Sequence, residues 1–335
     1  PRLTITEAHS FARHTGFSAR AKNVIPRRRS VLDSVTVFES LRSIATPGLD
    51  RVIKVVTDLG STTFYMIVIP VLYWCVSKSL GFSLAIVLSV SNYINVGIKF
   101  IVCRIRPYVA FPHLNAPEYL KLTGTGYSFP SGHAQGTSVF WTYLARSVRL
   151  KWIAVTGMAV VVVVAFTRVY ATCHYPTDVL AGAALGVAIA LAYAEIERRL
   201  QKLSAQGRSR IGLQLAVSIA LPGLAFALSA PRNPAFTQEV AQVLGFLAGA
   251  GIGYTLEAAY VRYDVRASLP IQVVKVALGM AGLMGVRYGL KAVFPDTAFW
   301  NMLRYLAVAV WATLGAPFVF KQLFGRRGAA RAEKR

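Results

Sequence analysis

The sequence predicts an all-α fold, a polytopic membrane helical bundle of about nine transmembrane helices with an amphipathic N-terminal prelude. Of its 335 residues, 55% are hydrophobic and only 15% are charged, and the mean hydropathy is +0.49. Soluble domains carry charges at about a quarter of their positions. The apolar residues also gather into runs that are long enough to cross a bilayer as helices. Together these observations indicate an integral membrane protein.

The first 60 residues are predicted to form a prelude outside the membrane. Residues 1–30 are polar and basic and end in "PRRRS", which is typical of a surface arm. Residues 31–59 have apolar side chains at helical spacing, but charges recur too often for a span, and Pro47 and Gly48 interrupt the pattern. We therefore expect two short amphipathic helices that lie in the membrane interface.

Two blocks of apolar runs follow the prelude. Residues 61–198 hold the first block, residues 199–210 form a basic linker, residues 211–325 hold the second block, and residues 326–335 are a basic tail. Each run is predicted to cross the membrane once. The runs lie near residues 62–78, 81–103, 134–148, 151–171, 177–197, 211–230, 237–257, 267–290 and 298–324.

The formal net charge of +23 comes from 37 Lys and Arg against 14 Asp and Glu. These cations lie between the apolar runs and form no continuous stripe, which disfavours nucleic-acid binding and fits anionic lipid headgroups. The loops at 149–151, 198–210 and 261–266 are basic, as is the tail. The positive-inside rule then puts the C-terminus in the cytoplasm and the 104–133 loop on the extracytoplasmic or luminal side of a bacterial inner membrane or an ER-type membrane. The same topology places the basic arm at residues 1–30 on the extracytoplasmic side, which conflicts with the positive-inside rule.

Three groups of polar residues face this extracytoplasmic side, beginning with "KFIVCRIRP". Lys99 and Arg106 are seven residues apart, so we expect them on one face of a helix, two turns from each other. Arg104 lies between them and need not share that face. By itself the group is typical of cations that snorkel at a helix end.

The second group, Pro130-Ser131-Gly132-His133, directly precedes an apolar run. If a helix begins here, its unpaired N–H groups and its dipole favour a bound anion. Gly132 would let the anion approach the backbone closely. By itself the group is more typical of a Ser cap followed by an incidental histidine.

The third group is "TRVYATCHYPTD", residues 167–178. Arg168 ends one span, His174 lies in the short turn, and Pro176 fits the first turn of the next helix. Asp178 can then reach back to one ring nitrogen of His174 and set its tautomer, which leaves the other nitrogen free. By itself this group is typical of an ordinary turn with a capping aspartate.

Taken together, the groups place three cations, two histidines, a helix N-terminus and a carboxylate on one membrane face, and these are the groups needed to bind and attack a phosphate. They resemble the signature of the type 2 phosphatidic acid phosphatase (PAP2) superfamily, with Thr167 in place of the family's Ser. The resemblance covers residues 60–198, and the span count is similar to the sphingosine-1-phosphate phosphatase and glucose-6-phosphatase branches. The matching residues are Lys99-x6-Arg106-Pro107, Pro130-Ser131-Gly132-His133 and Thr167-Arg168-x5-His174-x3-Asp178.

The resemblance implies a metal-independent phosphatase without a cofactor. It implies that His174 attacks phosphorus and forms a phospho-histidine, that Asp178 orients His174, and that His133 protonates the leaving alkoxide and then activates water. The implied phosphate-binding residues are Lys99, Arg106, Ser131, Gly132 and Arg168.

The substrate class stays open among several alternatives. A site at the membrane surface suits a lipid phosphate, such as a long-chain-base phosphate, phosphatidate, phosphatidylglycerol phosphate or a polyprenyl diphosphate. The alternatives are a sugar phosphatase, a lipid phosphotransferase, or a lipid transporter in which Pro222 and Gly223 break a helix.

The second block carries two further features. The spacing of its glycines suits tight helix packing within the chain, which we favour, or a homodimer contact; they are Gly245, Gly249 and Gly253. Glu257 and Lys275 fall in predicted spans, and we interpret them as a buried ion pair.

Overall fold

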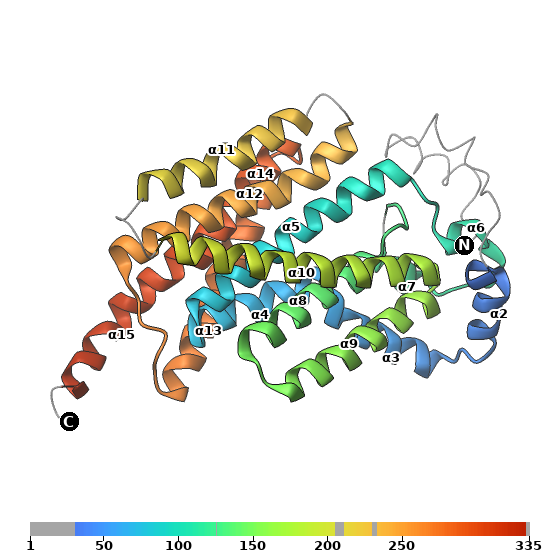
Figure 1. Cartoon of the computed structure of the whole chain (residues 1–335), viewed down its shortest axis with the longest axis horizontal. Coiled ribbons are helices and arrows are strands. Elements are labelled where there is room, and N and C mark those ends of the chain that lie inside the picture. The colour runs from blue at the N-terminus through green and yellow to red at the C-terminus, as the bar shows by residue number, and fades with distance from the viewer. Residues whose placement is uncertain (1–30, 125, 205–210, 230–232, 333–335) are drawn as a thin grey trace.

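The computed structural model describes residues 31–124, 126–204, 211–229 and 233–332, and its regular structure within these ranges is entirely helical. The predicted basic arm at 1–30 lies outside the described residues. Figure 1 shows an elongated bundle in which most of the long helices run along its length. The N-terminal helices α2 and α3 lie at one end of the bundle, and α15 extends from the other.

The prelude consists of a 3₁₀ turn, η2 (Val31–Asp33), and two helices, α2 (Val35–Ser43) and α3 (Pro47–Thr57). The expected pair of short helices is therefore confirmed. Thr46 ends the break between them, because its hydroxyl accepts a hydrogen bond from a first-turn N–H of α3 at 3.2 Å. A second 3₁₀ turn, η3 (Asp58–Gly60), leads into the bundle.

The first block contains the five expected helices. Short elements fill the loop between its second and third helices: α6 (Pro107–Ala110), η4 (Pro112–Leu114) and α7 (Glu118–Lys121). The five helices are α4 (Thr62–Cys75), α5 (Lys78–Val102), α8 (Gly132–Val148), α9 (Lys151–Tyr170) and α10 (Pro176–Ser204).

The second block contains four spans, two of which include a π-helical turn. The elements are α11 (Ile211–Ser229), α12 (Pro234–Leu256), η5 (Glu257–Val261), α13 (Leu269–Val293), α14 (Ala298–Val310), η6 (Trp311–Gly315) and α15 (Ala316–Ala332). Here η5 and η6 are the π-helical turns.

Every one of the nine predicted runs is helical, but they are not equally long. In the described part of the chain, seven helices are long and apolar enough to cross a membrane, or eight if α3 and α4 form one span bent by 48°. The two short ones are α4, with 14 residues, and α8, with 17 residues. A full crossing needs about 20 residues at 1.5 Å each, so these two helices reach only part of the way.

Three expected boundaries differ from the structure. α10 continues to Ser204, so the first half of the predicted linker is helical, and residues 205–210 lie outside the described residues. α15 likewise extends into the predicted tail. α11 runs without a break through Pro222, so the predicted discontinuity in this span is wrong. A proline removes one hydrogen bond and bends a helix without having to end it.

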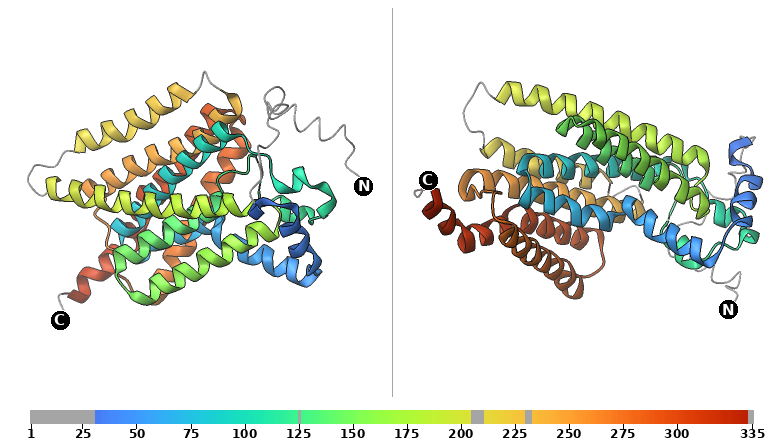
Figure 2. Two further views of the ribbon diagram at one scale, coloured as in Figure 1. Left: turned by 45° about the vertical axis from the view of Figure 1, so that its right-hand side comes forward. Right: turned by 90° about the horizontal axis from the view of Figure 1, so that it is seen from below.

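The two blocks pack along a shared set of central helices. α8 contacts α5, α9 and α10, whereas α12 contacts α5 on one side and α11 and α14 on the other. In the right-hand view of Figure 2, the green α8–α10 and the orange to red α13–α15 lie on opposite sides of the blue α4 and α5. The helices α5 and α12 therefore join the two blocks.

Glycines let these helices approach closely. A Cβ on Gly182 of α10 would lie 2.5 Å from the carbonyl oxygen of Ser131, and a Cβ on Gly186 would lie 2.4 Å from that of Gln135. Gly245, Gly249 and Gly253 of α12 face α14 in the same way, with Cβ positions 2.0–2.2 Å from α14 and η6 atoms. This glycine face therefore packs against α14 of the same chain, as expected. A homodimer contact through the same face would require α14 to move away.

The buried charges of the second block are paired differently from the expectation. Glu257 does not pair with Lys275; both its carboxylate oxygens lie 3.0 Å from Nζ of Lys78 at the start of α5. Lys275 donates to the carbonyl of Val265 at 3.0 Å and lies 4.8 Å from the ring centroid of Tyr263. Each group finds a partner from another element, as a buried charge requires.

Candidate functional site

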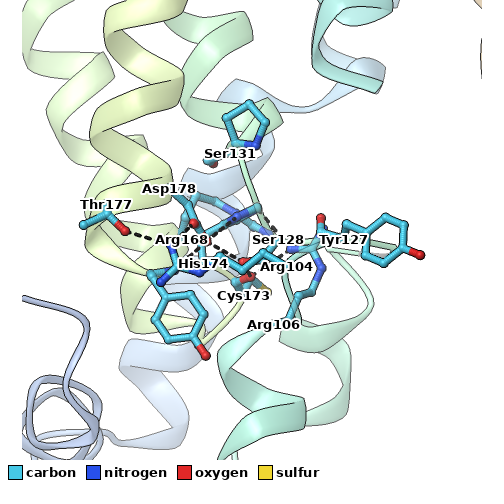
Figure 3. Close-up of polar contacts among 12 residues, drawn as sticks. Arg104, Arg106, Tyr127, Ser128, Ser131, Arg168, Cys173, His174, Thr177 and Asp178 are labelled. Carbon is cyan, nitrogen blue, oxygen red and sulfur yellow. Dashed lines mark hydrogen bonds and ion pairs between the residues drawn. The ribbon is translucent and has the colours of Figure 1, made fainter. Parts of the chain in front are cut away.

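The three polar groups meet at the end of the bundle that the prelude covers. Figure 3 shows Arg106, Arg168, His174 and Asp178 converging there together with the turn that holds Ser131. They come from the α5–α6 loop, the end of α9, the α9–α10 turn and the start of α10. Arg168 and Asp178 are fully buried, and His174 is 2% exposed.

Lys99 and Arg106 reach the site by a different route from the one expected. α5 ends at Val102 because Cys103 adopts a left-handed conformation with φ of 52°, and residues 103–106 are not helical. Lys99 therefore lies in the last turn of α5, whereas Arg106 is the N-cap of α6. The prediction that a continuous helix places both on one face is wrong, although both approach the same site.

Arg106 is held mainly by backbone carbonyls. Its Nε donates to Gly126 at 2.9 Å, Nη1 to Cys173 at 2.8 Å and Nη2 to Tyr127 at 3.0 Å. Nη1 also lies 3.0 Å from Nε2 of His174. These carbonyls fix the orientation of the guanidinium, whose positive charge can attract an anion.

Arg168 is held by threonines and has an unmatched donor. Its Nη1 donates to the hydroxyls of Thr57 and Thr123 at 2.8 Å each, and Nη2 donates to the Thr123 carbonyl at 3.2 Å. Its buried Nε has no hydrogen-bond partner among the described residues. Thr167, the departure from the family pattern, donates to the Val164 carbonyl at 2.7 Å and contacts the Thr57 hydroxyl at 3.1 Å.

Lys99 is the third cation. Its side chain is half-buried, and within the described part of the chain it makes no hydrogen bond or ion pair. It interacts electrostatically with Arg106 and Arg168, and with the carboxylates of Glu239 and Asp178. Three cations that interact electrostatically at one site favour the binding of a multiply charged anion.

The Pro-Ser-Gly-His turn starts α8 as expected. Ser131 is the N-cap, and its hydroxyl accepts from the N–H of Ala134 at 3.5 Å. The Ser131 N–H, expected in the anion cradle, donates to the carbonyl of Asp178 at 3.0 Å. The N–H groups of Gly132 and His133 have no partner among the described residues, so these two are the donors left at the helix N-terminus.

Asn95, a residue that sequence reasoning missed, supports this turn from α5. Its Nδ2 donates to the carbonyl of Pro130 at 3.3 Å and to Oε1 of Gln135 at 2.8 Å. Gln135 in turn donates to the carbonyl and the hydroxyl of Ser91 at 2.9 and 2.7 Å. A polar stripe of Ser91, Asn95 and Gln135 within apolar runs was the available signal, because buried polar side chains in a span need partners.

The hydrogen bonds of His174 determine its tautomer. Arg106 can only donate, so Nε2 of His174, 3.0 Å from Nη1, must accept and carry no proton. A neutral ring then has its proton on Nδ1, which lies 3.7 Å from Oδ2 of Asp178 and has no hydrogen-bond partner within range. The expected pair is present as a charge contact that is longer than a hydrogen bond.

Asp178 is bound more tightly to other groups. Its Oδ2 accepts from the hydroxyl of Ser128 and from the N–H of Tyr175, the latter at 2.9 Å, and its Oδ1 accepts from Arg104 at 2.6 Å. These donors keep the carboxylate in place beside the imidazole. Ser128 lies two residues before the Pro-Ser-Gly-His turn, and sequence reasoning did not assign it a role.

Arg104 and Asp33 form a second unanticipated part of the site. Arg104 donates to Asp178 and, through Nη2, to Oδ2 of Asp33 at 2.8 Å, and it lies 3.9 Å from the ring centroid of Tyr175. Asp33, buried in η2, also accepts from the N–H and the hydroxyl of Thr177 at 3.2 and 2.7 Å. The prelude therefore contributes a carboxylate directly behind Asp178, which Figure 3 shows in part through Arg104 and Thr177.

The electrostatic setting keeps both histidines neutral. Burial is the largest effect that lowers the pKa of His174 well below its usual value, followed by the charges of Arg106, Arg168 and Lys99. Burial also lowers the pKa of His133, and Arg168 and His174 add to this effect. A neutral imidazole with an unprotonated Nε2 beside a guanidinium is suited to nucleophilic attack on a bound anion. In the described part of the chain, no group of three or more His, Cys, Asp or Glu side chains is arranged to hold a metal ion.

Comparisons with known proteins agree with this arrangement. Residues 79–202 match the PAP2 superfamily, and residues 241–329 match the PAP2 superfamily phosphatase transmembrane extension. The chain is 31% identical over 121 residues to an undecaprenyl-diphosphatase of Sulfolobus acidocaldarius, covering 36% of this chain and 57% of that one. It is 24% identical over 229 residues to lipid phosphate phosphatase delta of Arabidopsis thaliana, covering 63% and 53%.

Two further matches come from Bacillus subtilis. Phosphatidylglycerophosphatase B is 26% identical over 157 residues, covering 43% of this chain and 73% of that one. A crystal structure of a PAP2-type phosphatidylglycerolphosphate phosphatase has a TM-score of 0.42 and 20% identity, covering 58% and 96%. The chain spans little more than half the length of the first two relatives. With its signature residues gathered at one end of a helical bundle, this chain carries a PAP2 superfamily domain followed by a PAP2 superfamily phosphatase transmembrane extension.

Proposed function

We propose that this protein is an integral-membrane, metal-independent phosphatase that hydrolyses a lipid phosphate. The observation that carries the proposal is the contact between Arg106 and the unprotonated Nε2 of His174, with Arg168 and Lys99 close by. The names of the relatives support a lipid substrate, since each is a phosphatase of a lipid phosphate or diphosphate. The helices that are long and apolar enough to span a membrane support it as well, because the site lies at one end of the bundle that they form.

Substrate binding begins with the phosphoryl group entering between Arg106 and His174. Arg106, Arg168 and Lys99 would contact its oxygens, and the N–H groups of Gly132 and His133 would complete the cradle. The N–H of Ser131 is not part of this cradle, because it already donates to the carbonyl of Asp178. The hydroxyl of Ser131 caps the helix. Phosphoryl transfer depends mainly on positioning and charge neutralisation, which these groups supply.

The reaction then follows a double displacement. Nε2 of His174 forms a bond to phosphorus as the bond from phosphorus to the lipid oxygen breaks, and the ring becomes positively charged beside Asp178. His133 gives its proton to the leaving alkoxide; the bound phosphate dianion offsets the effects that keep this ring neutral in the free protein. Water then gives a proton to His133 and attacks phosphorus, the N–P bond breaks, and inorganic phosphate leaves.

The proposal is tested by measuring phosphate release from micellar lipid phosphates and from glucose 6-phosphate, with and without EDTA. We expect release from at least one lipid, none from the sugar phosphate, and no effect of EDTA. His174→Ala should abolish release, whereas His113→Ala should not, because His113 is exposed and lies outside the site. Release from the sugar phosphate alone would replace the proposal with the sugar-phosphatase alternative. Transfer of phosphate to a lipid acceptor in place of its release would favour a phosphotransferase.

We further propose that the site faces the extracytoplasmic or luminal side and that the C-terminus is cytoplasmic. The support is the basic character of the loops at 149–151 and 261–266, which leave the membrane opposite the site. Vesicles of known orientation test this. Hydrolysis of a water-soluble, membrane-impermeant short-chain lipid phosphate should occur only when the extracytoplasmic face is outside.

A further inference from the structure

The C-terminal block brings a carboxylate to the edge of the phosphate site. α12 packs on α5 through Val240 and Leu244 against Val96. Aromatic rings continue this contact towards the site, with Phe236 5.3 Å from Phe100 and Phe100 5.5 Å from Tyr127 between ring centroids. Glu239 lies next to this contact on α12, in the four-span block that follows the catalytic motifs.

Glu239 is close to the loop that holds Arg106. One of its carboxylate oxygens, Oε1, lies 3.7 Å from the position that a Cβ on Gly126 would take. Gly126 has φ of +66°, and its carbonyl accepts from Nε of Arg106 at 2.9 Å. Only the width of one backbone segment therefore separates the Glu239 carboxylate from a cation of the phosphate site.

The carboxylate is available to a ligand. The side chain of Glu239 is exposed, and it makes no hydrogen bond or ion pair with any described residue. It nevertheless interacts electrostatically with Lys99 and Arg106. A structural carboxylate in this setting would be expected to pair directly with one of them, so its position points to a role towards the substrate.

The charge balance of the site shows what that role does. Lys99, Arg106 and Arg168 contribute three positive charges, and Arg104 with its two bound carboxylates contributes a net −1. The sum is +2, and Glu239 lowers it to +1. A phosphomonoester carries between about −1.5 and −2 at neutral pH, and a diphosphate carries a further negative charge beside it. The additional carboxylate therefore weakens the binding of a diphosphate more than the binding of a phosphomonoester.

We propose that Glu239 is a specificity-determining residue that selects a lipid phosphomonoester over a lipid diphosphate, and favours a headgroup with an amine or hydroxyl donor next to the phosphate. This inference rests on the proposed phosphatase function and deepens it. An ammonium or hydroxyl beside the phosphate would donate to the free carboxylate while the three cations hold the phosphoryl oxygens. A phosphomonoester without such a donor would gain nothing from Glu239.

The experiment compares the full-length wild type with Glu239→Gln, which keeps the size of the side chain and removes its charge. Gln238→Ala is the matched control, because Gln238 is the adjacent residue of the same helix and donates to Asp296 at 3.3 Å. kcat/KM is measured at pH 7.5 for a long-chain-base phosphate, which has an ammonium group, for phosphatidate, which has no such donor, and for a polyprenyl diphosphate.

Glu239→Gln should raise the ratio of diphosphate to phosphatidate kcat/KM about fivefold and lower the ratio of long-chain-base phosphate to phosphatidate by a similar factor. Gln238→Ala should change neither ratio. Unchanged ratios in Glu239→Gln, or an equal fall for all three substrates, would overturn the inference, because either result assigns Glu239 a purely structural role.

A binding measurement separates this inference from the phosphatase proposal. Calorimetric titration with pyrophosphate and with orthophosphate needs no turnover, and Glu239→Gln should tighten the binding of pyrophosphate more than that of orthophosphate. A wild type that hydrolyses none of the three lipids would refute the proposed function, and the binding ratio would still decide the role of Glu239. Equal effects on both anions would refute that role.

Discussion

Asp33→Asn tests whether the prelude takes part in catalysis. Asp33 accepts three hydrogen bonds, one from Arg104 and two from Thr177, and its carboxylate is buried. An asparagine in either orientation turns its NH₂ towards a group that only donates, the N–H of Thr177 or the guanidinium of Arg104. Among the described residues, Arg104 then has Asp178 as its sole anionic partner, and this pairing weakens the field that Asp178 exerts on His174.

The size of the effect follows from these contacts. A hydrogen bond that involves a charged group contributes about 1.5–3 kcal/mol. The Arg104 side chain is 26% exposed, so solvent screens part of this and we expect a loss of about 1.5 kcal/mol in stability. We expect kcat to fall about tenfold, which corresponds to about 1.4 kcal/mol in the barrier, with KM nearly unchanged because Asp33 does not reach the phosphate cradle.

The assay is phosphate release together with a thermal melt of the detergent-solubilised protein. Glu39→Gln is the matched control, because Glu39 is a half-exposed carboxylate of the same prelude whose partner is the exposed His113 at 3.5 Å. It should change neither kcat nor Tm. An Asp33→Asn protein with a lower Tm and an unchanged kcat would refute the reasoning, since Asp33 would then only fasten the prelude to the bundle.

Three further predictions concern the groups around the proposed phosphate site. The pKa of His174 is lowered in the folded protein, so the unfolded chain binds more protons than the folded chain as the pH falls below about 6.5. Tm should therefore drop more between pH 7 and pH 5 in the wild type than in His174→Gln. Gly182→Ala places a Cβ 2.5 Å from a backbone carbonyl of the Pro-Ser-Gly-His turn and should lower Tm and activity, with a cost of about 1–3 kcal/mol, whereas Gly97→Ala, which points into open space, should do neither. Gly124→Ala places a Cβ 2.9 Å from Nη1 of Arg106 and 3.0 Å from Nη2 of Arg168, and should raise KM about tenfold with little change in Tm; an unchanged KM would show that these guanidinium groups do not need their present positions.

Much of the fold could be predicted because a membrane leaves a chain few choices. A segment inside the bilayer must satisfy its own backbone groups, so a long apolar run becomes a helix whatever its neighbours are. The same local logic predicted the break before α3 at Pro47 and the start of α10 at Pro176. Loops and ends were less predictable, as the extension of α10 to Ser204 illustrates.

The α9–α10 turn was equally accessible to sequence reasoning. Arg168, His174 and Asp178 are close in the chain, so helix ends and the i, i+4 spacing bring them together without help from distant segments. Arg106 was different. Its position depends on the left-handed backbone conformation of Cys103, for which cysteine has no intrinsic preference. It also depends on hydrogen bonds to the backbone carbonyls of residues 126, 127 and 173.

By itself the sequence determined the helices, the three polar groups and their family signature, because hydropathy and spacing are local properties of the chain. Only the tertiary structure revealed that Asp33 lies behind Asp178, that Asn95 holds the turn before α8, and that Glu239 lies beside the loop that holds Arg106. These partners come from segments far apart in sequence. A buried or isolated charge takes its partner from whichever side chain the packed helices bring near, and no local pattern encodes that choice.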